Sequence, residues 1–311
     1  MALIKGILAK EGKGVEKGSS DNKSPFILFF EIYGRKFWNI CQVTLFYMIA
    51  SIPTFVVMMF LSGLISSHIT NMAKPYLEMA LATGNQTQDA AMVVAYTAIF
   101  DIIVRFVISL VVSARWGMGP VTAGYTYILR NYSREEHAFP WSDFKEHIFK
   151  NFKQTLVIWI VDVLVFGLTV FAFLFYSSEG GSIGLVKYFV MFVILAYTIM
   201  HIYIYPLTIT YKLKIKDIFR NSFLLAVGAL PSSILTVLVT IGVNIFMIWF
   251  GLKVPFAGAS LGYWTCYIIL AVVVFPGFTG LLKNFVAQRT IKKLWPGAKE
   301  NETVNDEKFL Y

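Results

Sequence analysis

Residues 221–252 read NSFLLAVGALPSSILTVLVTIGVNIFMIWFGL, a stretch without a single Asp, Glu, Lys or Arg. Three more stretches, 37–73, 188–211 and 254–282, are equally free of these charged residues. A helix needs about 20 mostly apolar residues to cross the hydrocarbon core of a bilayer, so each stretch can hold a crossing. Charged residues make up 14% of the chain, whereas soluble domains contain about 25%. The sequence therefore predicts an all-α integral membrane protein.

The apolar stretches divide into six predicted spans. We place these spans near residues 40–64, 92–114, 155–176, 188–210, 230–251 and 260–282. Residues 31–295 are thus expected to form one polytopic helix bundle, between a flexible basic arm at 1–30 and a disordered tail at 296–311. The arm lacks the apolar core of about 7–15 residues that marks a cleavable secretion signal.

The positive charges are distributed very unevenly between the two sets of connections. Of the 27 Lys and Arg residues, 23 lie in the terminal segments or the even-numbered connections. Only three lie in the other connections, the longest of which is 66–91. The positive-inside rule then places both termini in the cytoplasm. The net charge of +9 follows the ends of apolar runs, so we expect anionic lipid headgroups as its partner and no nucleic acid.

The connection between the second and third spans is expected to contain two amphipathic helices. Apolar residues recur at helical spacing from 121 to 132, and Pro140 then interrupts the pattern. A second helix should begin at Trp141, with Ser142 or Asp143 as its N-cap. Its mixture of basic and aromatic residues is typical of a helix that lies in the headgroup plane. Docking of a cytoplasmic partner is the alternative.

The same connection is the most distinctive part of the sequence. Residues 117–130 read GMGPVTAGYTYILR, and residues 134–144 read REEHAFPWSDF. With RKFW at 35–38, this pattern resembles the YesL-like family of bacterial integral membrane proteins, most strongly over residues 29–152. The resemblance implies a multi-pass protein of the bacterial cell membrane. It also implies an association with carbohydrate uptake or use, although no reaction is assigned to the family.

Two interpretations of this motif remain open. In the structural one, Gly119 permits unusual backbone dihedrals, Pro120 starts a helix, and Gly124 lets two backbones approach closely. In the functional one, the motif belongs to a surface that binds a cytoplasmic partner. The residues that we would assign to such a surface are Arg130, Arg134, Glu135, Trp141 and Asp143.

Ionisable side chains inside the predicted spans are the candidates for chemistry. Asp101 and Arg105 lie four residues apart, so they share a helical face in the favourable acid-before-base order. Asp162 is the one charged residue of the third span, and His201 lies among tyrosines in the fourth. An unpaired charge at the bilayer centre is unfavourable by about 2.5–3.5 kcal/mol, so such residues suggest a functional site. We therefore predict an intramembrane polar site formed by these four residues.

The alternative is that these residues are structural. Asp101 and Arg105 would then be an ion pair facing the bundle interior, and His201 a hydrogen-bonded core residue. Asp162 has three options: it pairs with Arg105, it reaches a water-filled cavity, or it is protonated in apolar surroundings.

The sequence contains no catalytic, nucleotide-binding or metal-ligand spacing, so we expect no enzyme, no cofactor and no metal. The favoured hypothesis is a non-enzymatic accessory protein for carbohydrate uptake, with membrane transporter subunits as partners. The alternative is a small secondary carrier that uses the intramembrane polar residues. A short repeat, FKNF at 149–152 and FRNSF at 219–223, supports the carrier because transporters often contain internal repeats. Chance similarity is the competing explanation.

Overall fold

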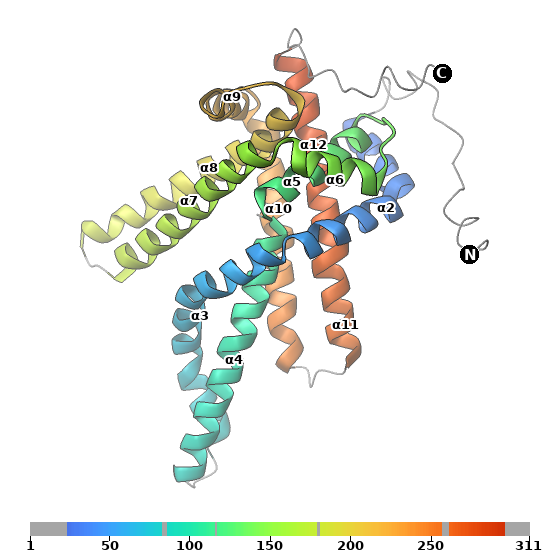
Figure 1. The fold of residues 1–311 in the computed structure, drawn as a ribbon. Helices are drawn as coiled ribbons and strands as arrows, with labels where there is room; N and C mark the ends of the chain where they lie inside the picture. The colour runs from blue at the N-terminus through green and yellow to red at the C-terminus, as the bar shows by residue number, and fades with distance from the viewer. Residues whose placement is uncertain (1–23, 83–85, 116, 179–180, 257–260, 296–311) are drawn as a thin grey trace, which may run out of the picture.

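The computed structural model describes residues 24–82, 86–115, 117–178, 181–256 and 261–295, and these residues form helices and no strand (Figure 1). In chain order the helices are α2 (Pro25–Ala50), α3 (Ile52–Leu81), α4 (Gln86–Arg115), α5 (Gly119–Ser133), α6 (Pro140–Lys150), α7 (Phe152–Ser178), α8 (Val186–Thr210), α9 (Ile215–Gly228), α10 (Leu230–Phe256), α11 (Leu261–Ile269) and α12 (Phe275–Leu294). A 3₁₀ turn at Ile183–Leu185 precedes α8, and a π-helical segment at Leu270–Val274 joins α11 to α12.

The helices have the length and composition of membrane spans. Within the described ranges, five helices are long and apolar enough to cross a bilayer, and a bent pair of helices provides a sixth candidate. Large apolar side chains such as Phe171 and Phe189 are exposed on the outer faces of α7 and α8, as lipid-facing residues are. The prediction of an all-α, polytopic membrane helix bundle is confirmed.

The first predicted span, 40–64, is not one straight helix. The chain bends by 62° at Ser51, between Pro25–Ala50 and Ile52–Gly63. Pro53 lies in the first turn of α3 and has no N–H to continue the ladder of α2. As a result α2 runs across the bundle, while α3 runs along it (Figure 1). α2 also begins inside the predicted arm at 1–30; the rest of that arm and the predicted tail at 296–311 lie outside the described residues.

The predicted outer connection at 66–91 is largely helical. α3 continues to Leu81 and α4 begins at Gln86, with Pro75 inside α3. The two helices form an antiparallel hairpin in which the Ser62 and Ser109 hydroxyls lie 3.0 Å apart. Hydroxyl contacts between closely packed helices are a usual means of association in membranes. The polar residues that the structure describes on either side of 83–85 are therefore helical and part of the hairpin.

Three helical hairpins extend away from α5, the helix at the centre of the fold. α3–α4, α7–α8 and α10–α11 each close at an end that lies away from α5, α6 and α9 (Figure 1). The start of α2 and the end of α12 lie on the side of α5, α6 and α9.

The structure contains the two helices expected between the second and third crossings, and it places them differently from each other. α5 is buried along almost its whole length and contacts α2, α6, α7, α8 and α12. α6 is amphipathic: it buries Phe144 and His147 and exposes Trp141 and Phe149. The repeat motif also differs between its two copies, because 149–152 spans the α6–α7 junction and 219–223 lies within α9.

The start of α6 differs from the predicted one. The helix begins at Pro140 with Phe139 as its N-cap, and neither Ser142 nor Asp143 occupies that position. The Asp143 carboxylate instead accepts a hydrogen bond from the backbone N–H of Phe139, at 2.8 Å. A carboxylate in the first turn satisfies a free N–H and interacts favourably with the helix dipole.

His147 gives this region an expected pH dependence. Its ring stacks on Tyr127 at 3.4 Å between centroids, and its Nδ1–H donates to the Asp143 carbonyl at 2.9 Å. Burial lowers the pKa of His147 from 6.5, and the positive charges of Lys150 and Arg130 lower it further; the Asp143 carbonyl and Glu146 oppose the shift. The folded state therefore binds fewer protons than the unfolded state, and stability falls as the pH drops below about 6.5.

We expect His147→Gln to lose less thermal stability than the wild type between about pH 7.5 and about pH 5. The measurement is the unfolding midpoint of the detergent-purified protein across that range. The matched control is His137→Gln, since His137 is an exposed histidine of the neighbouring connection. Equal acid sensitivity of His147→Gln and wild type would contradict the expectation.

Candidate functional site

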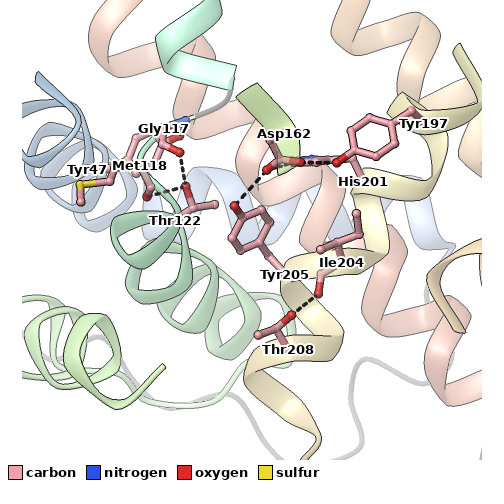
Figure 2. Close-up of polar contacts among 10 residues, drawn as sticks. All are labelled: Tyr47, Gly117, Met118, Thr122, Asp162, Tyr197, His201, Ile204, Tyr205 and Thr208. Carbon is pink, nitrogen blue, oxygen red and sulfur yellow. Dashed lines mark hydrogen bonds and ion pairs between the residues drawn. The ribbon is translucent and has the colours of Figure 1, made fainter. Parts of the chain in front are cut away.

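Asp162 is the centre of a buried hydrogen-bonded cluster between α7 and α8 (Figure 2). The Tyr197 hydroxyl donates to Oδ1 at 2.5 Å, and the Tyr205 hydroxyl donates to Oδ2 at 3.2 Å. His201 Nε2 lies 3.3 Å from Oδ2. Asp162 is 5% exposed and His201 6% exposed. The carboxylate is thus surrounded by polar groups of a single neighbouring helix.

The spacing of these groups on α8 explains why they meet one carboxylate. Tyr197, His201 and Tyr205 are separated by four residues each, so they lie on one helical face. Tyr203 points elsewhere, and its hydroxyl lies 2.6 Å from that of Ser233 on α10. The four-residue spacing was the signal that could have added the two tyrosines to the predicted site.

Asp101 and Arg105 form a separate pair inside the α3–α4 hairpin. Arg105 Nε donates to Asp101 Oδ2 at 2.6 Å, and the Thr70 hydroxyl donates to Oδ1 at 3.3 Å. The Arg105 side chain is 37% exposed, and Gly63 leaves room for it, since an added Cβ there would lie 3.0 Å from Nη1. The predicted ion pair is confirmed.

The four predicted intramembrane residues therefore belong to two hairpins. Asp162 and His201 come together on α7–α8, whereas Asp101 and Arg105 lie on α3–α4, and the two hairpins project in different directions (Figure 1). Of the three options predicted for Asp162, pairing with Arg105 is wrong, because Arg105 pairs with Asp101 in the other hairpin. The carboxylate is paired with His201 and two tyrosines.

A break between two helices lies beside the Asp162 cluster. α4 ends at Arg115 and α5 begins at Gly119. In the linker, the Gly117 N–H donates to the Tyr47 hydroxyl at 2.7 Å. The Thr122 hydroxyl turns back to the carbonyl groups of Gly117 and Met118, each at 3.1 Å (Figure 2).

The first residue of α5 packs directly on α7. A Cβ added at Gly119 would lie 2.0 Å from the Thr155 carbonyl oxygen and 2.7 Å from Trp159 Cβ. Asp162 follows Trp159 by three residues, or about 4.5 Å along the helix axis. The N-terminal end of α5 therefore approaches the level of the carboxylate. The partial positive charge of a helix N-terminus stabilises a negative charge in that position.

The helix is also interrupted at the start of α12, and this interruption contacts the same region of α5. Tyr125 of α5 stacks on Tyr47 of α2, with ring centroids 4.4 Å apart. Its hydroxyl donates to the Pro276 carbonyl at 3.0 Å and lies 3.2 Å from the Thr44 hydroxyl. Pro276 follows the π-helical segment, and π-helical turns occur frequently at functional sites. Tyrosines and helix ends thus meet at the centre of the fold.

Two residues of the predicted partner surface are buried against α5 and α6. The Arg130 guanidinium lies over the Tyr127 ring at 4.7 Å and donates to Asn131 Oδ1 at 3.0 and 2.8 Å. Asp143 is buried and accepts from the Phe139 backbone. Neither side chain faces outward.

The other three residues of that surface differ in exposure. Arg134 donates to Gln288 Oε1 on α12 at 2.9 and 2.6 Å. Glu135 pairs with Arg35 of α2 and has a φ of 61°, a conformation that a glutamate rarely adopts. Trp141 is 59% exposed and contacts Phe46 at 5.1 Å between ring centroids. Trp141 is therefore the one outward-facing member of the predicted set.

In the described part of the chain, no group of three or more His, Cys, Asp and Glu side chains is arranged to hold a metal ion. In comparisons with known proteins, no family model, no curated protein and no solved structure matches this sequence. The resemblance to the YesL-like family therefore stays a prediction.

Proposed function

We propose that this protein is a small secondary carrier in which the Asp162–His201 pair binds and releases a proton. The observation that supports this function best is the burial of two ionisable groups, 3.3 Å apart, inside a membrane hairpin. Ionisable residues within spans are unfavourable, and they commonly form proton relays in pumps and transporters. The neighbouring helix breaks add support, since transporters place their binding sites at discontinuous helices.

The chemistry assigned to the site is proton exchange without any covalent step. When a proton arrives, it is held between Asp162 Oδ2 and His201 Nε2, which lie 3.3 Å apart. The tyrosine hydroxyls keep the carboxylate oriented in both protonation states. Because the charge of the cluster changes by one, its attraction to the N-terminal end of α5 changes as well. We propose that this change biases the α7–α8 hairpin between two positions.

The orientation and the solute are part of the same proposal. The 23-to-three bias of Lys and Arg favours placing α5, α6, α9 and both termini in the cytoplasm of a bacterial cell. The resemblance to the YesL-like family favours carbohydrates as the first solutes to test.

An accessory role in carbohydrate uptake, with transporter subunits as partners, is the second candidate. The exposed Trp141 favours it, because tryptophan often anchors protein interfaces. Four of the five residues assigned to the partner surface are engaged within the fold, so we place the carrier first.

The test is proton-linked transport by the purified protein in liposomes loaded with a pH-sensitive dye. We expect at least one sugar in a panel of mono- and disaccharides to accelerate proton entry. Asp162→Asn should reduce this entry to the rate of protein-free liposomes, because an amide does not exchange a proton in this pH range. Asp217→Asn in the first turn of α9 makes the same chemical change outside the site and should transport normally.

Two results would overturn the carrier. The first is a wild-type protein that accelerates proton entry with none of the sugars. The second is an Asp162→Asn protein that transports as fast as the wild type.

A further inference from the structure

The break between α2 and α3 and the break between α4 and α5 lie against each other. The Gly117 N–H donates to the Tyr47 hydroxyl at 2.7 Å. A Cβ added at Gly117 would lie 2.5 Å from Ser51 Oγ. The last turn of α2, the first turn of α3 and the linker before α5 therefore meet at one place in the membrane domain.

Two buried hydroxyl groups at this place are unsatisfied. Ser51 is 1% exposed and Thr54 is fully buried, and neither hydroxyl oxygen has a hydrogen-bond partner among the residues that the structure describes. Ser51 is the N-cap of α3 and Thr54 lies in its first turn, three residues later, so they lie on neighbouring positions of one face. Burying a hydroxyl without a hydrogen bond costs roughly 1–3 kcal/mol.

The hydroxyl groups of Thr210 and Tyr267 are also buried without a partner in the described part of the chain, but several other hydroxyl groups in the spans avoid this penalty. They donate to a backbone carbonyl one turn earlier, as do those of Thr97, Thr169, Thr236 and Thr240. Ser51 and Thr54 lie at the helix break, where the preceding turn bends away by 62°. Their hydroxyl oxygens are thus available to a ligand.

Backbone carbonyl oxygens at the same break are further possible ligand atoms. Pro53 has no N–H, so it cannot donate to the carbonyl of Ile49 four residues earlier. The Ser51 N–H is directed to the carbonyl groups of Tyr47 and Met48, at 2.9 and 3.2 Å. Carbonyl oxygens at helix C-terminal ends carry partial negative charge, and α2 and α4 both end here; the N-terminal ends of α3 and α5, which carry partial positive charge, begin beside them.

We propose that a monovalent alkali cation binds between these two breaks, held by Ser51 Oγ, Thr54 Oγ1 and carbonyl oxygens of the last turn of α2. Neutral hydroxyl and carbonyl oxygens are the ligands that dehydrated alkali cations accept, and unwound helices provide such ligands in sodium-coupled transporters. This site does not depend on the proposed proton-linked carrier, because its ligands are different residues.

The test is the thermal unfolding midpoint of the full-length protein in detergent. Choline chloride is replaced by LiCl, NaCl or KCl at the same ionic strength. We expect at least one alkali cation to raise the midpoint by about 3 °C in a saturable manner, because a ligand that binds only the folded state stabilises it. Sodium gluconate should give the same rise as NaCl.

Matched variants locate the effect. Thr54→Val preserves the shape of the side chain, and with Ser51→Ala it should remove the cation-dependent rise. Ser62→Ala in the same helix removes a hydroxyl that already has a partner, so its rise should be retained. If the double variant does not fold, Thr54→Val alone serves, with an expected weakening of at least tenfold in the half-saturating concentration.

Three results would overturn the cation site: equal midpoints in all four chloride salts, a midpoint that follows the anion, or an unchanged cation response in the Thr54→Val variants. The comparison of proton entry between the wild type and Asp162→Asn does not depend on any of these outcomes, so the two proposals fail separately.

Discussion

Gly119→Ala is expected to lower the free energy of unfolding by about 3 kcal/mol, near the upper end for overpacked cores. The new Cβ would lie 2.0 Å from the Thr155 carbonyl oxygen, which belongs to the backbone of α7. A backbone atom cannot rotate away, so α5 must separate from α7. The separation would disturb Asp162, which lies seven residues, or about two turns, beyond Thr155. The unfolding midpoint should fall by roughly 5 °C.

A matched substitution on α7 shows whether the contact is the cause. A Cβ added at Gly167 meets no heavy atom within 4 Å. Gly167→Ala should therefore be neutral or stabilise the helix by roughly 0.5–1 kcal/mol. If Gly119→Ala unfolds at the same temperature as Gly167→Ala, the close approach of α5 to α7 is not what holds this region together.

Asp162→Leu is expected to be the most damaging substitution within the polar cluster, with a loss of about 3–5 kcal/mol. The carboxylate accepts hydrogen bonds from Tyr197 and Tyr205 and pairs with His201. Leucine would leave these buried polar groups without their shared partner. The loss should be seen as a lowered unfolding midpoint in detergent.

A partial recovery of stability would show that the loss comes from unpaired hydrogen-bond donors and not from the change in side-chain volume. Adding Tyr197→Phe and Tyr205→Phe to Asp162→Leu removes two of the abandoned donors, so stability should recover by about 1–3 kcal/mol. In the wild-type background the same two substitutions should be destabilising. A mutant cycle with no coupling between Asp162 and the tyrosines would contradict the hydrogen-bonded cluster.

The spans could be predicted from the sequence because bilayer thickness imposes a length on each apolar run. The hydropathy of an apolar stretch does not determine how its helix is oriented relative to the bundle. The apolar stretch 37–73 is continuous, yet Ser51 and Pro53 divide it into a helix across the bundle and a helix along it. Likewise, polar residues after position 73 resembled a loop, although pairing between α3 and α4 keeps them helical.

The Asp101–Arg105 pair was predictable because both residues lie on one helix at a fixed spacing. Predicting the Asp162–His201 pair would have required knowing where the chain turns between α7 and α8. Both residues are almost equally far from Gly181, so the hairpin brings them to the same level. The predicted partner surface was harder, because arginine is normally exposed. Arg130 is buried by its contact with an aromatic ring, which sequence spacing does not reveal.

The central position of α5 has a consequence for how the chain is made. The Tyr125 hydroxyl is bonded to a carbonyl that lies 151 positions later in the chain. While the ribosome is still synthesising α10, α5 lacks its contacts with α12. Polar groups of α5 that are buried in the finished protein are then exposed to lipid or to chaperones. The core around α5 is therefore complete only after α12 has been synthesised. A chain that terminates before α12 lacks these core contacts.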